Sequence, residues 1–339
     1  MSELLLPAQA APSMLRHPLF RPLAALALLL IIDVIAIPGF LQLSVRDGHL
    51  YGSIVDILNR AAPLMLAALG MTLVIATRGI DISVGAVVAL SGSVAAVLVG
   101  GAPEAQTPLL WAMAAGMGAA LLCGLWNGLL VASLGLQPIV ATLILMVAGR
   151  GLAQLLTDGQ IITVYHAPYF FLGGGYFLGL PFSLTVVALV FAAIALMMRK
   201  SALGLFIQAV GINPVAARLA GLRTATLIVF VYAFCAACAG LAGLMVSSNI
   251  KSADANNAGL LLELDAILAV TLGGTSLAGG KFSLVGSVIG ALIIQTLTFT
   301  IYSLGVPPEV NMVVKAIVVF AVCLSQSAQF KQIFSRRPA

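Results

Sequence analysis

Arg78 and Asp81 are charged residues in unusual surroundings, because the stretch ATRGIDISVGAVV (76–88) lies between two long apolar runs. A charge at the centre of a membrane-spanning helix costs about 2.5–3.5 kcal/mol, whereas one Leu or Ile recovers only about 0.3–0.6 kcal/mol. The sequence avoids this cost if the helix breaks here. We then expect Gly79 to end one helix, Asp81 or Ser83 to cap the next, and Arg78 to reach lipid phosphates. Alternatively, and compatibly with a break, Asp81 turns inward and lines a solute path, as carboxylates at membrane depth often do.

Other polar and charged residues also interrupt the apolar runs. They are Asn127, Gln137, Arg150, Gln154, Glu263, Asp265, Gln295 and Lys315. Side chains of these types at membrane depth almost always face the interior of a helix bundle and pair with one another. Arg150 and Lys315 therefore need counterions, for which we consider Asp265 and Asp81.

A constellation for catalysis or metal binding is not visible in the sequence. The three histidines lie in the N-terminal tail or in predicted outer loops. Cys235 and Cys238 form a C-x-x-C, but without a βαβ pattern they are better interpreted as small helix-packing residues. The stretch TSLAGGKF (275–282) superficially resembles a phosphate-binding loop, yet Thr275 and Phe282 occupy the positions that require Gly and Ser or Thr. We therefore predict that this chain is not an enzyme and binds no metal or cofactor itself.

The composition is that of an integral membrane protein. Of the 339 residues, 61% are hydrophobic and only 8% are charged, against roughly 25% charged residues in soluble domains. Several apolar runs approach the length of about 20 residues that spans a bilayer. The net charge of +5 does not indicate a nucleic-acid partner, because the basic residues gather in three segments that the positive-inside rule assigns to the cytoplasm. They are Arg16 and Arg21; Arg199, Lys200, Arg218 and Arg223; and Lys331, Arg336 and Arg337.

Hydropathy and charge together predict an all-α protein of about ten transmembrane helices, with both termini in the cytoplasm. The expected helices cover residues 22–38, 57–77, 83–101, 109–134, 138–157, 180–198, 224–247, 264–279, 283–303 and 308–325. A single transmembrane domain, 22–325, would then lie between cytoplasmic tails 1–21 and 326–339.

Two local patterns add detail to this topology. In the cytoplasmic loop 199–223, Asn213 is a suitable N-cap, Pro214 suits the first helical position and Gly221 suits the C-terminal cap, which predicts a short helix over 214–220. In addition, SLGLQPIV (133–140) recurs as SLGVPPEV (303–310) on the opposite predicted side. Such a recurrence is typical of an inverted repeat, here the second to fifth helices against the seventh to tenth.

Three ordered blocks also carry a family resemblance. GMTLVIATRGIDISVGAVVAL (70–90) resembles the Gly-Gly-Ile-Asp-Leu-Ser-Val-Gly signature of permeases from ribose-type sugar ABC importers. Residues 124–156 and 253–293 are similar to the second and third blocks of that family, so that the resemblance covers most of 55–325. The segments LNRAAP, LWNG and QPIVATLILMVAGRG are most similar to the galactofuranose permease branch. Arg78 departs from the family pattern, in which a second glycine is usual.

This resemblance implies a membrane-spanning permease subunit that moves a monosaccharide by alternating access. Galactofuranose is the first expected substrate, and a ribose- or galactose-like sugar is the other. A separate ATPase subunit would use ATP and Mg²⁺, a periplasmic or extracellular sugar-binding protein would deliver the sugar, and a second permease would complete a homo- or heterodimer. The chain would cross the lipid of a bacterial inner membrane several times. The alternative is an ion-coupled secondary sugar transporter, in which Asp81, Asp265 or Glu263 carries a proton.

The same resemblance implies roles for particular residues. The short cytoplasmic helix would be a coupling helix that sits in a groove of the ATPase. Its residues are Asn213, Pro214, Ala216, Ala217, Arg218 and Gly221. A sugar path needs amide and carboxylate groups against an apolar or aromatic wall. The residues selected for this path are Asp81, Asn127, Gln137 and Asp265, led by the first two.

Overall fold

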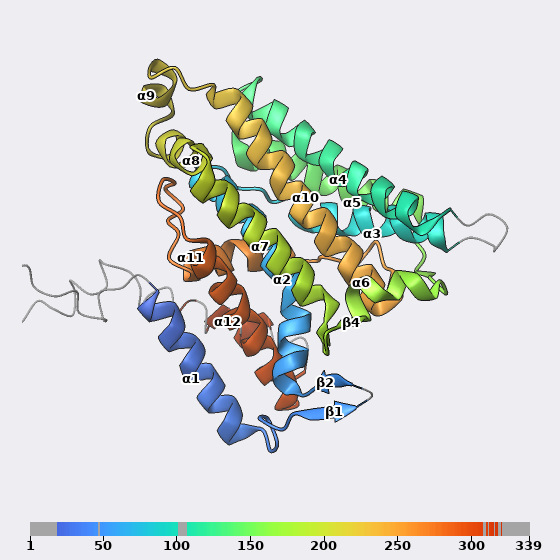
Figure 1. Cartoon of the computed structure of the whole chain (residues 1–339). Helices are drawn as coiled ribbons and strands as arrows, with labels where there is room; N and C mark the ends of the chain where they lie inside the picture. The colour runs from blue at the N-terminus through green and yellow to red at the C-terminus, as the bar shows by residue number, and fades with distance from the viewer. Residues whose placement is uncertain are drawn as a thin grey trace, which may run out of the picture.

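The computed structural model describes residues 19–46, 48–100 and 107–307, together with 310, 312–314, 316, 317 and 320. Helices make up most of this part of the chain (Figure 1). They are α1 (Phe20–Ala36), α2 (Ser53–Ala76), α3 (Val84–Val99), α4 (Leu109–Ala132), α5 (Pro138–Leu156), α6 (Phe171–Gly174), α7 (Phe182–Lys200), α8 (Leu203–Ile212), α9 (Pro214–Leu219), α10 (Thr224–Ile250), α11 (Leu262–Leu272) and α12 (Leu284–Ser303).

Short antiparallel strand pairs connect some of these helices. Strand β1 (Ser44–Arg46) pairs with β2 (His49–Tyr51), and β4 (Tyr176–Phe177) pairs with β5 (Leu180–Pro181). Strand β3 (Ile162–Thr163) pairs with β6 (Ser252–Ala253), which ties the loop after α5 to the end of α10. In Figure 1, α8 and α9 gather at one end of the molecule, which we call the α9 end. The β1–β2 hairpin lies at the opposite end, which we call the hairpin end.

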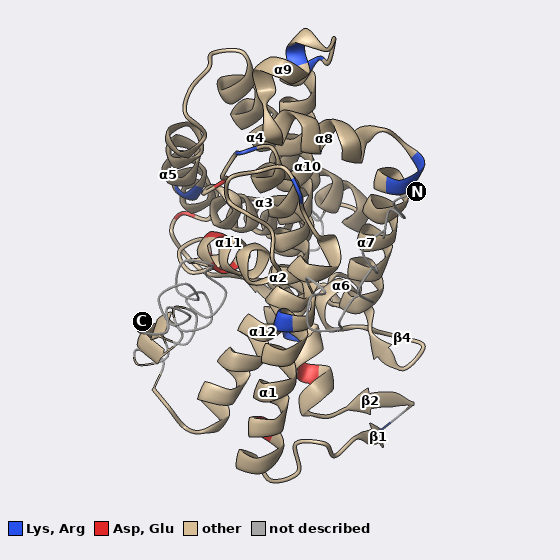
Figure 2. Cartoon of the chain, turned by 90° about the vertical axis from the view of Figure 1, so that its left-hand side faces the viewer, with Lys and Arg blue, Asp and Glu red and all other residues tan. Residues whose placement is uncertain are grey.

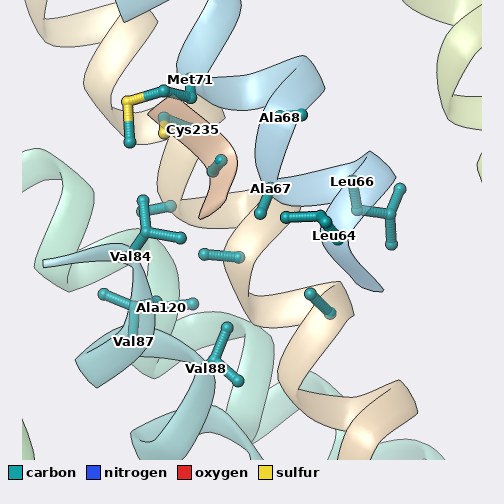
Figure 3. Packing of buried hydrophobic residues seen from close by; sticks show 14 of the residues in the cluster. Leu64, Leu66, Ala67, Ala68, Met71, Val84, Val87, Val88, Ala120 and Cys235 are labelled. Carbon is teal, nitrogen blue, oxygen red and sulfur yellow. The ribbon is translucent and has the colours of Figure 1, made fainter. Parts of the chain in front are cut away.

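Helices α2 and α10 form the centre of the bundle and pack against each other. Small residues permit this close approach, as they commonly do between helices in membranes. A Cβ atom added to Gly70 of α2 would lie 2.8 Å from Cα of Cys235 on α10. Figure 3 shows Met71 of α2 near Cys235, with Val84 and Val87 of α3 filling the neighbouring space. Cys235 and Cys238 are free and buried, in line with a packing role.

The outward faces of several helices are apolar, which indicates contact with lipid. On α4, Trp111 is 71% exposed and Leu122 is 69% exposed, and α5 and α7 also expose large aliphatic side chains. Among the described residues, six helices are long and apolar enough to cross a membrane: α2, α4, α5, α7, α10 and α12. Figure 2 shows that charged residues are sparse along the helices of the bundle. The prediction of an all-α, multi-pass membrane protein is therefore confirmed.

The predicted number of ten spanning helices is not confirmed. Helices α1, α3 and α11 have 17, 16 and 11 residues. They are therefore shorter than a full span, which needs about 20 residues. The helix predicted over 264–279 ends at Leu272, because Gly274, Gly279 and Gly280 adopt positive φ angles of 90°, 82° and 92°. The helix predicted over 308–325 lies largely outside the described residues.

The predicted loop 199–223 contains more structure than expected. In addition to α9, it forms α8, whose Gly204, Ile207, Val210 and Gly211 are buried. Gly211 packs directly against the last carbonyl of α2, at Ala76. The loop is therefore part of the packed bundle, and α8 connects α7 to α9 at the α9 end.

Candidate functional site

The break after α2 has a defined backbone structure at the α9 end. Arg78 donates its backbone N–H to Ile75 (2.9 Å), and Gly79 donates to Val74 (2.9 Å). These two bonds form a Schellman motif, which requires a left-handed residue that is usually glycine. Arg78 takes this position with φ 66°. The prediction that Gly79 ends the helix was therefore wrong by one residue, and Gly79 is instead confined by Val74 and Tyr232.

The side chain of Arg78 binds two backbone carbonyls that are far away in the sequence. Its Nε donates to Ala278 (3.0 Å) and its Nη2 donates to Ile212 (2.6 Å). Because Ile212 is the last residue of α8, the guanidinium lies at the negative end of that helix. The expected contact of Arg78 with lipid phosphates is thus corrected, since its donors bind the protein itself. Arg78 joins the end of α2, the end of α8 and the loop before α12.

Asp81 and Asn127 meet in the interior beside this break. The Oδ1 atom of Asp81 accepts hydrogen bonds from the Ser83 backbone N–H (2.9 Å) and hydroxyl (2.6 Å). Asn127 Nδ2 donates to the same hydroxyl (2.9 Å) and, at 3.5 Å, to Asp81. Thr142 of α5 accepts from the Ile82 backbone N–H (3.2 Å). Ser83 is the N-cap residue of α3, but the acceptor for its backbone N–H is Asp81. Through Asn127 and Thr142 the break is attached to both α4 and α5.

The four residues predicted for a sugar path do not come together. Asp81 is 1% exposed and Asn127 is fully buried, so that neither reaches a surface. Gln137 is exposed and directly precedes α5, whereas Asp265 is half-buried in the first turn of α11. The structure therefore brings together one pair of the set, Asp81 and Asn127, and gives that pair a structural role at the break.

Arg150 of α5 holds the segment that returns from α10 to α11. Its Nη1 donates to the carbonyls of Ala258 (2.6 Å) and Ala255 (3.1 Å). One turn later, Gln154 donates to Asn256 (2.7 Å). The predicted pairing of Arg150 with Asp81 or Asp265 is corrected, because the hydrogen bonds of Arg150 go to backbone carbonyls. Lys315 lies outside the described residues.

The short helix α9 has the predicted caps. Asn213 Oδ1 accepts from the backbone N–H groups of Val215 and Ala216, both at 3.0 Å, and Pro214 occupies the first helical position. At the other end, Gly221 has φ 87° and completes a second Schellman motif. The helix ends at Leu219, one residue earlier than predicted. Figure 2 shows a basic position on α9 at one extremity of the molecule.

The surface of α9 has an apolar component that the sequence analysis missed. Val215 is 66% exposed and Leu219, one turn later, is 85% exposed, whereas Ala217 is buried against the rest of the chain. Their i, i+4 spacing was the available signal, because it places both on one helix face. Ala217 thus supports α9 from within, and Val215, Arg218 and Leu219 present the outward face.

Within the described part of the chain, no group of three or more His, Cys, Asp and Glu side chains is arranged to hold a metal ion. The two connected features, the break and α9, contain cationic, carboxylate, hydroxyl, amide and apolar groups. Their geometry suits the transmission of movement between helices.

Residues 53–323 match the family model described as branched-chain amino acid transport system / permease component. The chain belongs to this permease family. The galactofuranose transporter permease protein YtfT of Escherichia coli (strain K12) is 52% identical over 308 residues, which cover 91% of this chain and 89% of that protein. The fructose import permease protein FruF of Bifidobacterium longum (strain NCC 2705) is 38% identical, over 92% of this chain and 88% of that protein.

The ribose import permease protein RbsC of Escherichia coli (strain K12) is also 38% identical to this permease, over 89% of this chain and 91% of that protein. No solved structure matches the chain. The resemblance read from the three sequence blocks is therefore confirmed, as is the greater similarity to the galactofuranose permease than to the ribose permease. The matched region includes every helix from α2 to α12.

Proposed function

We propose that this chain is the membrane-spanning permease subunit of an ATP-binding-cassette importer for a monosaccharide, with galactofuranose as the first candidate and a ribose- or galactose-like sugar as the second. The observation that carries the proposal is the 52% identity to a galactofuranose permease over 91% of the chain. The named relatives are import permeases for sugars, which does not favour the alternative of an ion-coupled secondary transporter. The membrane would be the inner membrane of a bacterium.

The complex would contain a separate ATPase that uses ATP and Mg²⁺, a sugar-binding protein outside the membrane, and a second permease subunit. The proposal places the α9 end and both termini in the cytoplasm, because Arg199, Lys200, Arg218 and Arg223 lie at or next to α7, α9 and α10 there. The exposed α9 face of Val215 and Leu219, beside Arg218, fits a groove of the ATPase. This permease would not hydrolyse ATP itself.

Movement of α9 would reach the transmembrane bundle through Arg78. Ile212, whose carbonyl accepts from Arg78, directly precedes Asn213, the N-cap of α9. On the other side of Arg78, the chain continues to Asp81, which is fastened to α4 through Ser83 and Asn127. In this scheme nucleotide binding shifts the equilibrium between inward- and outward-open states only through its different affinity for the two.

The inverted repeat is part of the proposal, and the packing supports it. Helix α10 packs on α3 and α4, as α2 packs on α11 and α12. Helix α2 is followed by Arg78 and α10 by Lys251, each with a left-handed φ, of 66° and 56°. Three residues further on, Asp81 and Asp254 each accept the backbone N–H of the residue two positions later, at 2.9 and 3.0 Å. Both halves of the molecule thus use the same kind of helix ending.

The proposed scheme also bears on which of the four predicted path residues could contact the sugar. Gln137 is exposed and Asp265 is half-buried, and both stay our candidates for contact with the sugar in this state. Asp81 and Asn127 would reach the path only in a state in which α4 separates from the break. Alternating access requires such a second arrangement of packed helices.

Reconstitution tests the proposed function. The permease is placed in liposomes with the ATPase and the sugar-binding protein that the proposal requires, and uptake of radiolabelled D-galactose, D-fructose and D-ribose is measured with and without ATP. We expect concentrative uptake of one sugar that requires ATP and all components. Concentrative uptake by the permease alone, driven by a proton gradient, would overturn the proposal.

A further inference from the structure

A polar cavity of about 290 Å³ lies between the beginning of α2 and the end of α12, towards the hairpin end. Its lining includes Asp56 and Arg60 from α2 and Gln295, Thr298, Phe299 and Tyr302 from α12. Its volume is near the lower end of small-molecule sites, which begin at roughly 300 Å³, and suits a single small ring. The sequence analysis missed both charged residues, although their i, i+4 spacing places them on one face of α2.

The polar side chains of this cavity are available to a ligand. Among the described residues, none forms a hydrogen bond with the carboxylate of Asp56, the guanidinium of Arg60 or the amide of Gln295. Together they offer acceptors, donors and a group that does both, which is what the hydroxyl groups of a sugar require. One carboxylate and one guanidinium also balance in charge, so the site favours a neutral polyhydroxylated ligand over a sugar acid.

The depth of the cavity argues against contact with lipid. Arg60 lies seven residues beyond the start of α2, which is about 10 Å along the helix axis. Charged side chains at membrane depth face a water-filled cavity or other protein, since exposure to hydrocarbon is costly. The outward faces of α4 and α7 are aliphatic by contrast, for example at Leu122 and Leu189. The α2–α12 face at this end therefore faces water or another protein and not lipid.

Aromatic groups complete the cavity. Phe299 packs against buried Phe40 with ring centroids 6.1 Å apart, which fixes its orientation. Tyr302 is 51% exposed at the rim. The pKa of the nearby Tyr176 is raised to about 12, mainly because the side chain is partly buried. The hydrogen bond and charge of Tyr51 and the charge of Asp56 raise this pKa further. Sugar sites combine such aromatic surfaces with a few polar groups that fix orientation.

We infer that this α2–α12 cavity binds a neutral monosaccharide on the outer side of the permease, where it receives the sugar before translocation. The inference rests on the proposed function and adds the residues that contact the sugar. Asp56 and Gln295 accept from sugar hydroxyls, Arg60 and Gln295 donate to them, and Phe299 and Tyr302 cover the ring faces.

Cysteine accessibility in the reconstituted complex tests the inference. Thr298→Cys is introduced with Cys323→Ser, since the other three cysteines are buried. A membrane-impermeant methanethiosulfonate reagent is then added with and without a sugar. The sugar is the one among D-galactose, D-fructose and D-ribose that the wild-type complex takes up. We expect rapid labelling that the sugar prevents. Leu122→Cys on the aliphatic face of α4 is the matched control and should not react.

Uptake kinetics provide a second measurement. Arg60→Gln should raise the KM for uptake by about tenfold to hundredfold, the range for one hydrogen bond to a charged group. Arg46→Gln, in the exposed strand β1 at the same end, should leave KM unchanged.

Absence of labelling, labelling that the sugar does not prevent, or an unchanged KM for Arg60→Gln would each overturn the inference. Absence of ATP-dependent uptake by the wild-type complex would overturn the proposed function instead.

Discussion

Replacing Arg78 gives the sharpest test of how movement of α9 reaches the bundle. Arg78→Ala removes two hydrogen bonds from a cation to carbonyls, at Ile212 and Ala278, and keeps a non-glycine residue at φ 66°. Arg78→Gly removes the same bonds but also removes the strain of the left-handed backbone conformation. This conformation costs a non-glycine residue roughly 1–2 kcal/mol. Arg78→Lys keeps the charge but has a single donor group, which cannot span both carbonyls as the guanidinium fork does.

Hydrogen bonds to a charged group contribute about 1.5–3 kcal/mol each when they are shielded from water. Arg78 is exposed, so solvent screening reduces the two bonds to a total of about 2–3 kcal/mol. Both Arg78→Ala and Arg78→Gly lose this contribution to the free energy of unfolding. We expect Arg78→Gly to be more stable than Arg78→Ala by about 1 kcal/mol, because glycine adopts the left-handed conformation without strain. Thermal unfolding of the purified permease in detergent measures this difference.

Loss of the link should also reduce the coupling of ATP hydrolysis to transport. Couplings of 1–3 kcal/mol correspond to about 5- to 150-fold effects, so both Arg78→Gly and Arg78→Ala should transport at least about fivefold less sugar per ATP hydrolysed. Arg78→Lys should be intermediate. The assay is the ratio of uptake to ATP hydrolysis in proteoliposomes, with Lys281→Ala, an exposed cation in the loop that contains Ala278, as control. A wild-type ratio in a stable Arg78→Gly variant would refute the reasoning.

Three further predictions concern packing and the ATPase contact. Val215→Asp should leave the permease folded but prevent co-purification of the ATPase, whereas Ala217→Asp should destabilise the permease itself, because Ala217 is buried; pull-down and thermal unfolding separate the two results. Gly243→Ala should destabilise the permease by about 1–3 kcal/mol through overpacking against α3, while Gly118→Ala, with no neighbour within 4 Å, should stabilise α4 slightly; equal unfolding temperatures would contradict this. Arg150→Gln should speed hydrogen exchange in residues 251–261 without affecting α9, and unchanged exchange would show that its carbonyl contacts are dispensable.

The extent to which sequence predicted this structure depended on the range of the interactions. Helix α9 was predicted nearly to the residue, because Asn213, Pro214 and Gly221 act on backbone groups within a few positions. The length of α11 was not predicted, since hydropathy does not register the left-handed glycines at 274, 279 and 280 that end its apolar run.

Contacts of the candidate site were mostly beyond sequence reasoning. The acceptors of Arg78 are 134 and 200 positions away, and nothing local distinguishes these carbonyls from others. Asp81 and Asn127 were both selected for their chemistry, yet their meeting at Ser83 depends on how α4 packs. The α2–α12 cavity could have been suspected from Asp56 and Arg60, but only the structure sets Gln295 beside them.

The short helix α11 has a consequence for biogenesis. Its 11 residues rise about 16 Å, roughly half the hydrocarbon thickness, and the chain reaches it through a two-residue strand and irregular turns in residues 251–261. Peptide groups of such a segment cannot face lipid, and here Arg150 of α5 binds several of them. A helical hairpin made of α11 and α12 therefore cannot enter the bilayer as an independent unit. During synthesis this part of the polypeptide must wait for α5 to be in place, which makes the assembly order of the protein partly obligatory.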